Sequence, residues 1–491
     1  MSKQLYRSIW RWHFFSGLYV VPFMLMLSLT GLVMLAGPWM DSYQYGEALT
    51  TVEAEIEKQI GEKLEGQAES EILVRYSADF QLAKVKKAYP TLQAAQYVPP
   101  VAETQSSIFK MRGDNFATTL VFVNPYNGKI LGDFDSSDRW YSIADNIHGT
   151  LMIGQIGDAL IELSAGLTIL LLMTGLYLYW PKTTFTFKAL FSPGFLLNWH
   201  KQGTRPNWKA IHASLGFYCS LFILFFALTG MAWTGIWGQQ LVQPYSSFPV
   251  EKRASSWQSN AALIEGRELI HGDLNEGQLN EIPWGLEQTP LPTSQPPTQT
   301  KVDSPSLDQI VEQGLDLGFL LQEGSRFRIA LPLKADGVYT LMSIASSRDV
   351  TDPRKDRTLH IDQYSSKVLA DIGWQDYNLA AKTMALGVPL HQGTLGWWNV
   401  LLASIVCLLL VLLSVSGIIM WWQRKPTAEL GAPTAHGHFK NLTVSKSGKA
   451  LLLICLMVAV LFPVTGGAML LFLTLDRLRS GTAEKSKLAE L

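Results

Sequence analysis

Residues 10–31 read WRWHFFSGLYVVPFMLMLSLTG, and residues 208–230 read WKAIHASLGFYCSLFILFFALTG. Both stretches contain His-x-x-x-Gly-x-Tyr, and both contain Thr-Gly after ten further residues. The matched pairs are His13 and His212, Gly17 and Gly216, Tyr19 and Tyr218, Thr30 and Thr229, and Gly31 and Gly230. Identities at identical spacing indicate that this part of the chain consists of two similar halves.

A second pair of motifs extends the repeat. NIHGTL begins at residue 146 and PLHQGTL at residue 389, and each precedes an apolar run. Each run ends in a hydroxyl residue plus glycine, followed by a tryptophan: Thr174, Gly175 and Trp180 in one copy, Ser416, Gly417 and Trp422 in the other. Four histidines therefore occupy repeat-equivalent places: His13, His148, His212 and His391.

The composition places the chain in a membrane. Of 491 residues, 48% are hydrophobic and 16% are charged, whereas a soluble domain carries about 25% charged residues. The net charge of −1 provides no field for nucleic acid, so we exclude that class. The three cysteines lie in separate apolar runs, which excludes a disulfide scaffold. Without a Cys-x-x-Cys-His motif, any haem must be held by coordination alone.

Five apolar segments reach the roughly 20 residues that a bilayer requires. They cover approximately 14–36, 159–180, 213–233, 399–422 and 451–473. The first is too long for a signal peptide and lacks a cleavage site, so we expect an uncleaved helix. The fold class that follows is an α-helical membrane protein with about five transmembrane helices, an internal two-helix repeat and two α+β periplasmic modules.

Basic residues gather before the first helix, between helices two and three, and between helices four and five, which places these segments in the cytoplasm. We therefore expect a protein of the bacterial inner membrane with large periplasmic loops. The predicted parts are the N-terminus with helix one (1–36), a first periplasmic module (37–147), helices two and three (148–237), a second periplasmic region (238–390), helices four and five (391–475) and a polar tail (476–491).

Both periplasmic regions have α+β character. In the first, Asn-Pro-Tyr-Asn-Gly at 124–128 separates two β-rich runs, which predicts a hairpin. The second region ends in the same order, apolar run, turn, lysine, apolar run, but Ser365-Ser366 stands in place of Asn127-Gly128. Its Pro-rich stretch, 283–305, is typical of a linker.

The depth of the four histidines suggests their chemistry. His13 and His212 begin helices at the cytoplasmic boundary, whereas His148 and His391 precede helices at the periplasmic boundary. Two imidazoles from opposing helices can hold a haem iron from both sides. A glycine one turn from each ligand, Gly17 or Gly216, leaves room for a flat macrocycle because it has no Cβ. Gly31 and Gly230, five turns on, lie on the same helix faces and could clear room for the outer cofactor.

For several other residues of these regions we expect structural roles and no cofactor binding. We expect Glu162 to lie at a helix boundary in contact with solvent, and the Thr-Gly pairs also suit close helix packing. The fifth apolar segment contains Thr-Gly, but Gly448 stands where the other copies have histidine, so we expect it to be structural. Five histidines lack repeat partners: His200, His271, His360, His436 and His438.

The order of these motifs resembles the PepSY-associated transmembrane family, whose members include inner-membrane ferric-siderophore reductases and iron-regulated membrane proteins. The resemblance rests on RWHFFSG, on IHASLG followed by LTG, on the Leu-His and Gly-Thr elements before helices two and four, and on VFVNPYNGKILGD, which is similar to the closing hairpin of a PepSY module.

The resemblance implies an oxidoreductase with two b-type haems that passes electrons across the membrane to ferric iron held by a siderophore or another chelator. His13, His148, His212 and His391 match the histidines of the family. From their depth we pair His13 with His212 and His148 with His391; the electron donor is a quinol or a cytoplasmic reductant. Two alternatives remain: a haem-free permease or accessory protein of iron uptake, and a membrane-anchored PepSY interaction protein.

Overall fold

The chain forms two compact units. The computed structural model describes residues 3–46, 50, 52, 75–113, 117–179, 204–246, 263–264, 267–268, 270–274, 282–296, 304–426, 431 and 446–475. The membrane unit comprises Met1–Leu32, Ile147–Val242 and Leu402–Leu491, and the sheet unit comprises Val33–Asn146 and Gln243–Leu401. Most of the predicted basic loops, the polar tail and three histidines (His200, His436 and His438) lie outside the described residues.

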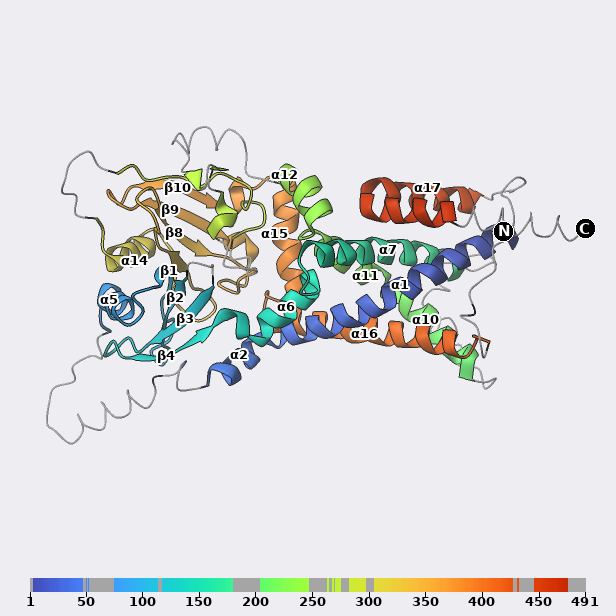
Figure 1. Cartoon of the computed structure of the whole chain (residues 1–491), viewed down its shortest axis with the longest axis horizontal. Coiled ribbons are helices and arrows are strands. Elements are labelled where there is room, and N and C mark those ends of the chain that lie inside the picture. The colour runs from blue at the N-terminus through green and yellow to red at the C-terminus, as the bar shows by residue number, and fades with distance from the viewer. Residues whose placement is uncertain are drawn as a thin grey trace, which may run out of the picture. The chain divides into compact units, whose positions relative to one another are not determined.

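Long apolar helices make up the membrane unit (Figure 1). α7 is central and packs against α10, α11, α17 and the π-helix η2. The bounds are α1 (Lys3–Leu35), α7 (Gln155–Tyr179), α10 (Thr204–Tyr218), α11 (Ser220–Met231), η2 (Gly235–Val242), α16 (Trp397–Trp422) and α17 (Lys446–Leu461). An apolar helix, Pro463–Leu475, follows α17.

The number of spans differs from the predicted five. Among the described residues, 3 helices are long and apolar enough to cross a bilayer alone, within α1, α7 and α16. The pair Asn207–Tyr218 and Ser220–Met231, bent by 60°, makes up to 4 if it counts as one span. The fifth predicted segment forms two shorter helices, because Pro463 cannot continue the hydrogen-bond ladder and starts a new helix instead. A chain that crosses the membrane several times is supported, and a fifth span stays a prediction.

One antiparallel sheet of eight strands forms the sheet unit, in the order β10-β9-β8-β7-β1-β2-β3-β4. Each half is a helix followed by a four-stranded meander. The first half is α5 (Ala78–Ala88), β1 (Gln93–Val98), β2 (Ser107–Arg112), β3 (Thr118–Val123) and β4 (Ile130–Asp135). The second is α14 (Leu307–Asp316), β7 (Arg328–Ala330), β8 (Val338–Ser343), β9 (Arg357–Asp362) and β10 (Val368–Gly373). β1 pairs with β7, so the two predicted α+β regions share one sheet.

Shorter elements complete the unit and its borders. They are α2 (Gly37–Tyr45), η1 (Ser136–Asp138), α6 (Trp140–Thr150), α12 (Gln243–Ser246), β5 (Leu263–Ile264), β6 (Arg267–Glu268), η3 (His271–Leu274), η4 (Pro353–Lys355), η5 (Trp374–Asp376) and α15 (Leu379–Gln392). The predicted hairpin at 124–128 is confirmed, since β3 pairs with β4 across it and Gly128 has φ +69°. Ser366 takes the corresponding left-handed conformation in the second half, with φ 59°.

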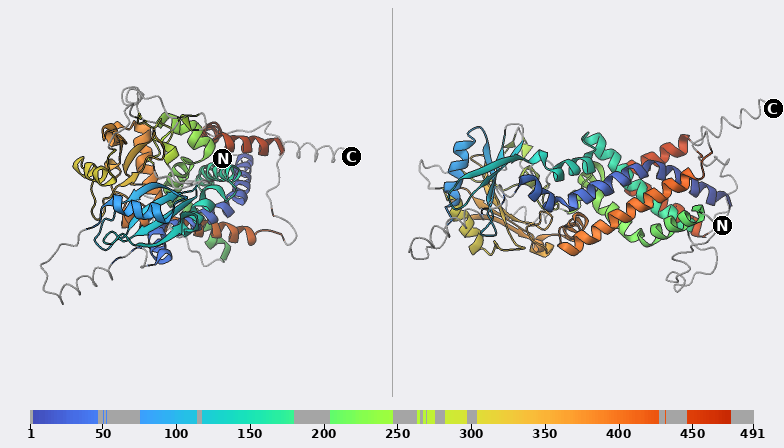
Figure 2. Two further views of the ribbon diagram at one scale, coloured as in Figure 1. Left: turned by 60° about the vertical axis from the view of Figure 1, so that its left-hand side comes forward. Right: turned by 90° about the horizontal axis from the view of Figure 1, so that it is seen from below.

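The two halves fasten to each other through their helix N-termini, which lie on one face of the sheet (Figures 1 and 2). The Asp79 carboxylate accepts hydrogen bonds from the backbone N–H groups of Leu307 and Asp308. In return, the Asp308 carboxylate accepts from those of Ala78 and Asp79. Burial acts to raise the pKa of Asp79, but these hydrogen bonds outweigh it and the pKa is lowered. Each carboxylate thus caps the other helix, where the helix dipole favours negative charge.

The opposite face of the second half-sheet carries its own core. Ile282 and Leu286 pack there with Met342, Ile344 and Ile372. The stretch with linker composition, 283–305, is described over 283–296 and 304–305. Within it, Trp284, Leu286 and Leu291 are buried. Proline-rich composition therefore coexists here with packing against the sheet, because apolar side chains stand between the prolines.

Candidate functional site

Two predicted site histidines meet inside the membrane unit. His13 comes from α1 and His212 from α10, and their ring centroids lie 6.4 Å apart with an angle of 87° between the planes. Bonds from histidine nitrogen to a metal measure about 2.0–2.1 Å, so two imidazoles on opposite sides of one ion have centroids roughly 6.3 Å apart. The observed separation equals that of a pair of axial ligands, and it also lies in the range of about 4.5–7 Å of direct edge-to-face ring contacts.

A hydroxyl group fixes the tautomer of His13. Its Nδ1 atom lies 3.0 Å from Oγ1 of Thr174 on α7. The Thr174 hydroxyl donates its own hydrogen to the Leu170 carbonyl at 2.8 Å. Because a hydroxyl has only one hydrogen, Oγ1 must accept from His13, which places the imidazole hydrogen on Nδ1. Nε2 then carries a lone pair, the form that binds a metal.

His212 has the same arrangement. Its Nδ1 atom lies 2.9 Å from Oγ of Ser416 on α16 and 3.2 Å from the Leu413 carbonyl oxygen. Ser416 donates its hydrogen to that same carbonyl at 2.7 Å. Both neighbours of Nδ1 are therefore acceptors, so Nδ1 carries the hydrogen and Nε2 the lone pair. Such outer hydrogen bonds orient metal-binding histidines and raise their basicity.

His148, at the end of α6, repeats the pattern a third time. Its Nδ1 atom lies 2.9 Å from Oγ1 of Thr30, and Thr30 donates to the Met26 carbonyl at 2.8 Å. All hydrogen bonds of these three histidines to described residues thus use Nδ1. The two segments hydrogen-bond to each other's histidine. α1 supplies His13 and Thr30, while the chain from α6 to α7 supplies His148 and Thr174.

The residue after each hydroxyl is a glycine that lies against the imidazole. A Cβ atom on Gly175 would lie 3.1 Å from Cε1 of His13, and one on Gly417 would lie 3.5 Å from Cε1 of His212. A Cβ on Gly31 would lie 3.8 Å from Cε1 of His148. We call each hydroxyl residue with its following glycine a hydroxyl–glycine cradle: Thr174–Gly175, Ser416–Gly417 and Thr30–Gly31.

The four predicted glycines fall into different surroundings. Among the described residues, a Cβ on Gly17 would make an ordinary contact with Leu171 at 3.8 Å, and one on Gly216 would make an ordinary contact with Leu413 at 3.9 Å. Gly31 packs on His148 and on Sγ of Cys407. Gly230 lies near the end of α11, where its carbonyl accepts a hydrogen bond from Trp233 at 3.4 Å. At Gly17 and Gly216 the neighbouring leucine is no closer than ordinary contact, so the predicted role of these two glycines beside a flat group stays a prediction.

His391 belongs to the sheet unit, near the end of α15. The helix ends at Gly393, which has φ 71°. Of the two predicted pairs, the structure brings together His13 and His212. The sharing of one haem by His148 and His391 stays a prediction. Among the described residues, no group of three or more His, Cys, Asp and Glu could hold a metal ion. Axial haem ligation requires only two side chains.

Glu162 is not in contact with solvent, contrary to our expectation. It is 1% exposed, and its Oε2 atom accepts hydrogen bonds from the backbone N–H groups of Ile236 and Trp237. Asp158, one turn earlier on α7, accepts from Gly235 at 2.8 Å. Both carboxylates cap the first turn of η2, whose leading N–H groups lack partners within the helix. The position of Glu162 within α7 gave no indication that its partners would be Ile236 and Trp237, which lie far along the chain.

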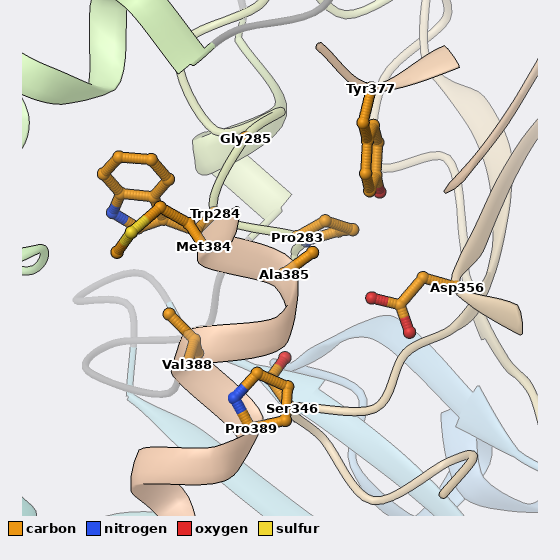
Figure 3. Close-up of a pocket in the computed structure, with 10 residues that line it drawn as sticks. All are labelled: Pro283, Trp284, Gly285, Ser346, Asp356, Tyr377, Met384, Ala385, Val388 and Pro389. Carbon is orange, nitrogen blue, oxygen red and sulfur yellow. The ribbon is translucent and has the colours of Figure 1, made fainter. Parts of the chain in front are cut away.

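The sheet unit contains a small cavity of about 20 Å³ with a mainly apolar lining (Figure 3). It is lined by Asp356 and Tyr377, with Pro389 and neighbouring side chains of α15. Burial raises the pKa of Asp356 well above its usual range, and the Tyr377 hydroxyl has no hydrogen-bond partner among the described residues. A water molecule needs about 10–15 Å³. The cavity suits one water and is too small for an iron chelate.

Comparison with known protein families assigns the chain to a family whose matched region includes the four histidines. A family model described as the PepSY-associated TM region matches residues 10–424. This chain belongs to that family. The matched range contains His13, His148, His212 and His391, together with the three cradles. A search of curated proteins found no match. Family membership and the long apolar helices together establish a membrane protein that crosses the bilayer several times.

Sequence reasoning noticed the cradles without finding their role. The sequence shows Thr174-Gly175 and Ser416-Gly417 as repeat partners at the ends of two apolar runs. Their distance along the chain from His13 and His212 hides the contact, since 161 and 204 residues separate the bonded pairs. The available signal was the recurrence of a hydroxyl–glycine pair wherever a repeat histidine occurs.

Proposed function

We propose that this protein is an electron-transfer protein of the bacterial inner membrane that binds two b-type haems and reduces ferric iron in a chelate at the periplasmic face. The observation that carries the proposal is the pair His13 and His212, with ring centroids 6.4 Å apart and both Nδ1 atoms tied to hydroxyl groups. Neutral imidazoles with free Nε2 lone pairs are the form in which histidine binds haem iron.

The protein's contribution is to hold, orient and insulate. Thr174 and Ser416 fix the tautomers of His13 and His212, and the glycines beside them leave the rings close to the helix backbones. Bound haem would supply the one-electron chemistry. The apolar side chains of α7, α11 and α16 pack together and limit the entry of water, for example Leu172, Ile223, Val406 and Leu410. Burial and hydrogen bonding at the ligands are the means by which a protein sets a haem potential.

A second haem follows from the repeat. His148 has a cradle of the same construction as those of His13 and His212. His391 is its repeat partner in sequence, and the family resemblance assigns the same role to both. The cradle at Thr30–Gly31 supports this proposal for His148, because a hydrogen on Nδ1 leaves the Nε2 lone pair for a metal.

The acceptor is proposed from chemistry and resemblance together. Hard oxygen ligands of a chelator hold ferric iron far more tightly than ferrous iron. Delivery of one electron therefore promotes release of the metal. Accordingly, the predicted direction of electron flow is from a donor on the cytoplasmic side to the chelate on the periplasmic side.

A transport function has less support. A permease requires polar groups in the membrane that are available to a substrate. The carboxylates of Asp158 and Glu162 are the most obvious candidates, and both are used to cap η2. An interaction protein that merely anchors the sheet unit gives no reason for three cradles.

An absorption spectrum tests the proposal directly. Purified full-length protein from haem-sufficient cells should show a Soret band and, after reduction with dithionite, sharp low-spin α and β bands. A pyridine haemochrome assay should give about two haems per chain. A colourless preparation under these conditions overturns the proposal and favours the permease or the anchor.

A further inference from the structure

A cavity of about 200 Å³ lies in the membrane unit between α1, α7 and the helix Pro463–Leu475. Its lining is almost entirely apolar and aromatic: Trp12, Phe15, Ser16, Tyr19, Leu163, Leu167, Leu170, Ala468, Met469, Phe472 and Leu473. Tyr19 donates its hydroxyl hydrogen to the Leu160 carbonyl at 3.2 Å. Ser16 contributes the second hydroxyl group, so the site is apolar with a few polar points.

The size of this cavity limits what fits inside it. An apolar cavity of about 150 Å³ accommodates a benzene molecule. A volume of about 200 Å³ therefore suits one substituted six-membered ring, with any tail left in the lipid. The rings of Trp12, Phe15 and Phe472 provide flat faces for such a head group.

A positive charge lies against two of the aromatic rings that line the cavity. The Arg11 guanidinium lies 5.0 Å from the ring centroid of Phe15 and 5.8 Å from that of Phe472, and both rings line the cavity. Guanidinium N–H groups donate hydrogen bonds to carbonyl or phenol oxygens. An acyl chain offers no such acceptor, whereas an oxygen-substituted ring does.

The cavity also adjoins the candidate haem ligand. Trp12 lines it, and the next residue in the chain is His13. Ser16 lies three residues beyond His13, which places it one turn along α1 on a neighbouring face. The cavity lining therefore includes residues directly before and one turn after His13 on the same helix.

We propose that this cavity binds the head group of a membrane quinol, the electron donor for the haem that His13 and His212 hold; the proposal rests on the proposed function. The quinol loses two O–H hydrogens as two protons and two electrons, becoming the quinone. Haem held by His13 and His212 would take up the two electrons one at a time, and the two protons would pass to water.

The first experiment measures haem reduction by menadiol in stopped flow, followed at the Soret band, on full-length protein in nanodiscs. Leu167→Trp fills the cavity, and Leu18→Trp, at a position 44% exposed, is the matched control. A tryptophan at position 167 fills the cavity, so we expect the reduction of haem by menadiol to be at least about tenfold slower in Leu167→Trp and unchanged in Leu18→Trp. Dithionite should reduce wild type and both variants alike. Equal menadiol rates in all three proteins overturn the proposal.

The second experiment does not depend on haem. An organic extract of each purified protein is analysed for quinone by chromatography and mass spectrometry. Wild type and Leu18→Trp should retain quinone, and Leu167→Trp should have lost most of it. Phospholipid alone in every extract overturns the quinol site in favour of an acyl chain. Protein without haem that still retains quinone refutes the proposed function and leaves the binding site standing.

Discussion

Two pairs of histidines in this protein illustrate how differently the same side chain can be used. In the membrane unit, His13 and His212 face each other at 6.4 Å between ring centroids, and each uses Nδ1 for a hydroxyl group. In the sheet unit, His271 and His360 have centroids 4.9 Å apart and Nε2 atoms 2.9 Å apart. The rings of the first pair are more widely separated, and the second pair is joined directly by a hydrogen bond.

The sheet-unit pair forms a closed chain of hydrogen bonds. His271 Nδ1 donates to the Thr289 carbonyl at 2.9 Å, so its Nε2 is the acceptor. His360 must then donate from Nε2, and its Nδ1 accepts from the Thr340 hydroxyl at 3.0 Å. Both rings are fully buried. A pair whose nitrogens are all used within the protein is structural, whereas a pair whose Nε2 atoms make no hydrogen bond to the described residues is a candidate for metal binding.

Removal of a ligand gives the largest expected difference between the pairs. His13→Ala should abolish one of the two haems, roughly halving the haem per chain in a pyridine haemochrome assay. His360→Ala should leave the haem content unchanged in whatever protein remains folded. Unchanged haem in His13→Ala, with loss in His360→Ala, would reverse the assignment of the two pairs.

The second-largest effect is expected from changes to the hydroxyl–glycine cradles. Thr174→Val removes the hydroxyl that accepts from His13 Nδ1 while nearly preserving shape, and loss of such an outer partner costs about 10–100-fold in metal affinity. Thr465→Val is the matched control, because Thr465 also precedes a glycine in an apolar helix but its hydroxyl has no partner among the described residues. Haem titration of the apoprotein measures both variants. Equal affinities in the two would mean that the cradle does not support the ligand.

The closed pair should make the sheet unit sensitive to acid. Burial, and then the neighbouring His271, lower the pKa of His360 well below its usual value of about 6.5. The unfolded chain therefore binds a proton before the folded one does, and stability falls as pH drops below about 6.5. Between pH 7 and 5 the loss should reach about 1–2 kcal/mol. His360→Gln, compared by calorimetry with wild type, should show a smaller loss over this range; an identical pH dependence would contradict the neutral pair.

The smallest effect concerns the glycines of the two cradles. Gly175→Ala places a Cβ 3.1 Å from His13, closer than ordinary contact, whereas Gly417→Ala places one 3.5 Å from His212. We expect a small shift in the α band or reduction potential for Gly175→Ala and a smaller one for Gly417→Ala. A larger shift in the second variant would show that the two cradles differ in a way the distances do not capture.

The repeat, the apolar helices and the hairpin at 124–128 were accessible from the sequence because each depends on residues close together along the chain. His13 and His212 were likewise found as a pair. The bend at Cys219 and the break before Pro463 reduce the number of unbroken spans below what apolar length alone indicates. Capping of η2 by Glu162 was missed, since the bonded residues are 74 and 75 positions apart.

The sequence alone determined which residues are equivalent, because repeated spacing on a helix or strand repeats the face on which a side chain lies. Only the tertiary structure decided what each equivalent residue contacts. It placed Thr174 beside His13 and Thr30 beside His148. It also joined the two half-sheets at β1 and β7 and brought His271 within hydrogen-bond distance of His360. The reason is that a hydrogen-bond partner selects the tautomer of a histidine, and that partner is chosen by packing between distant segments.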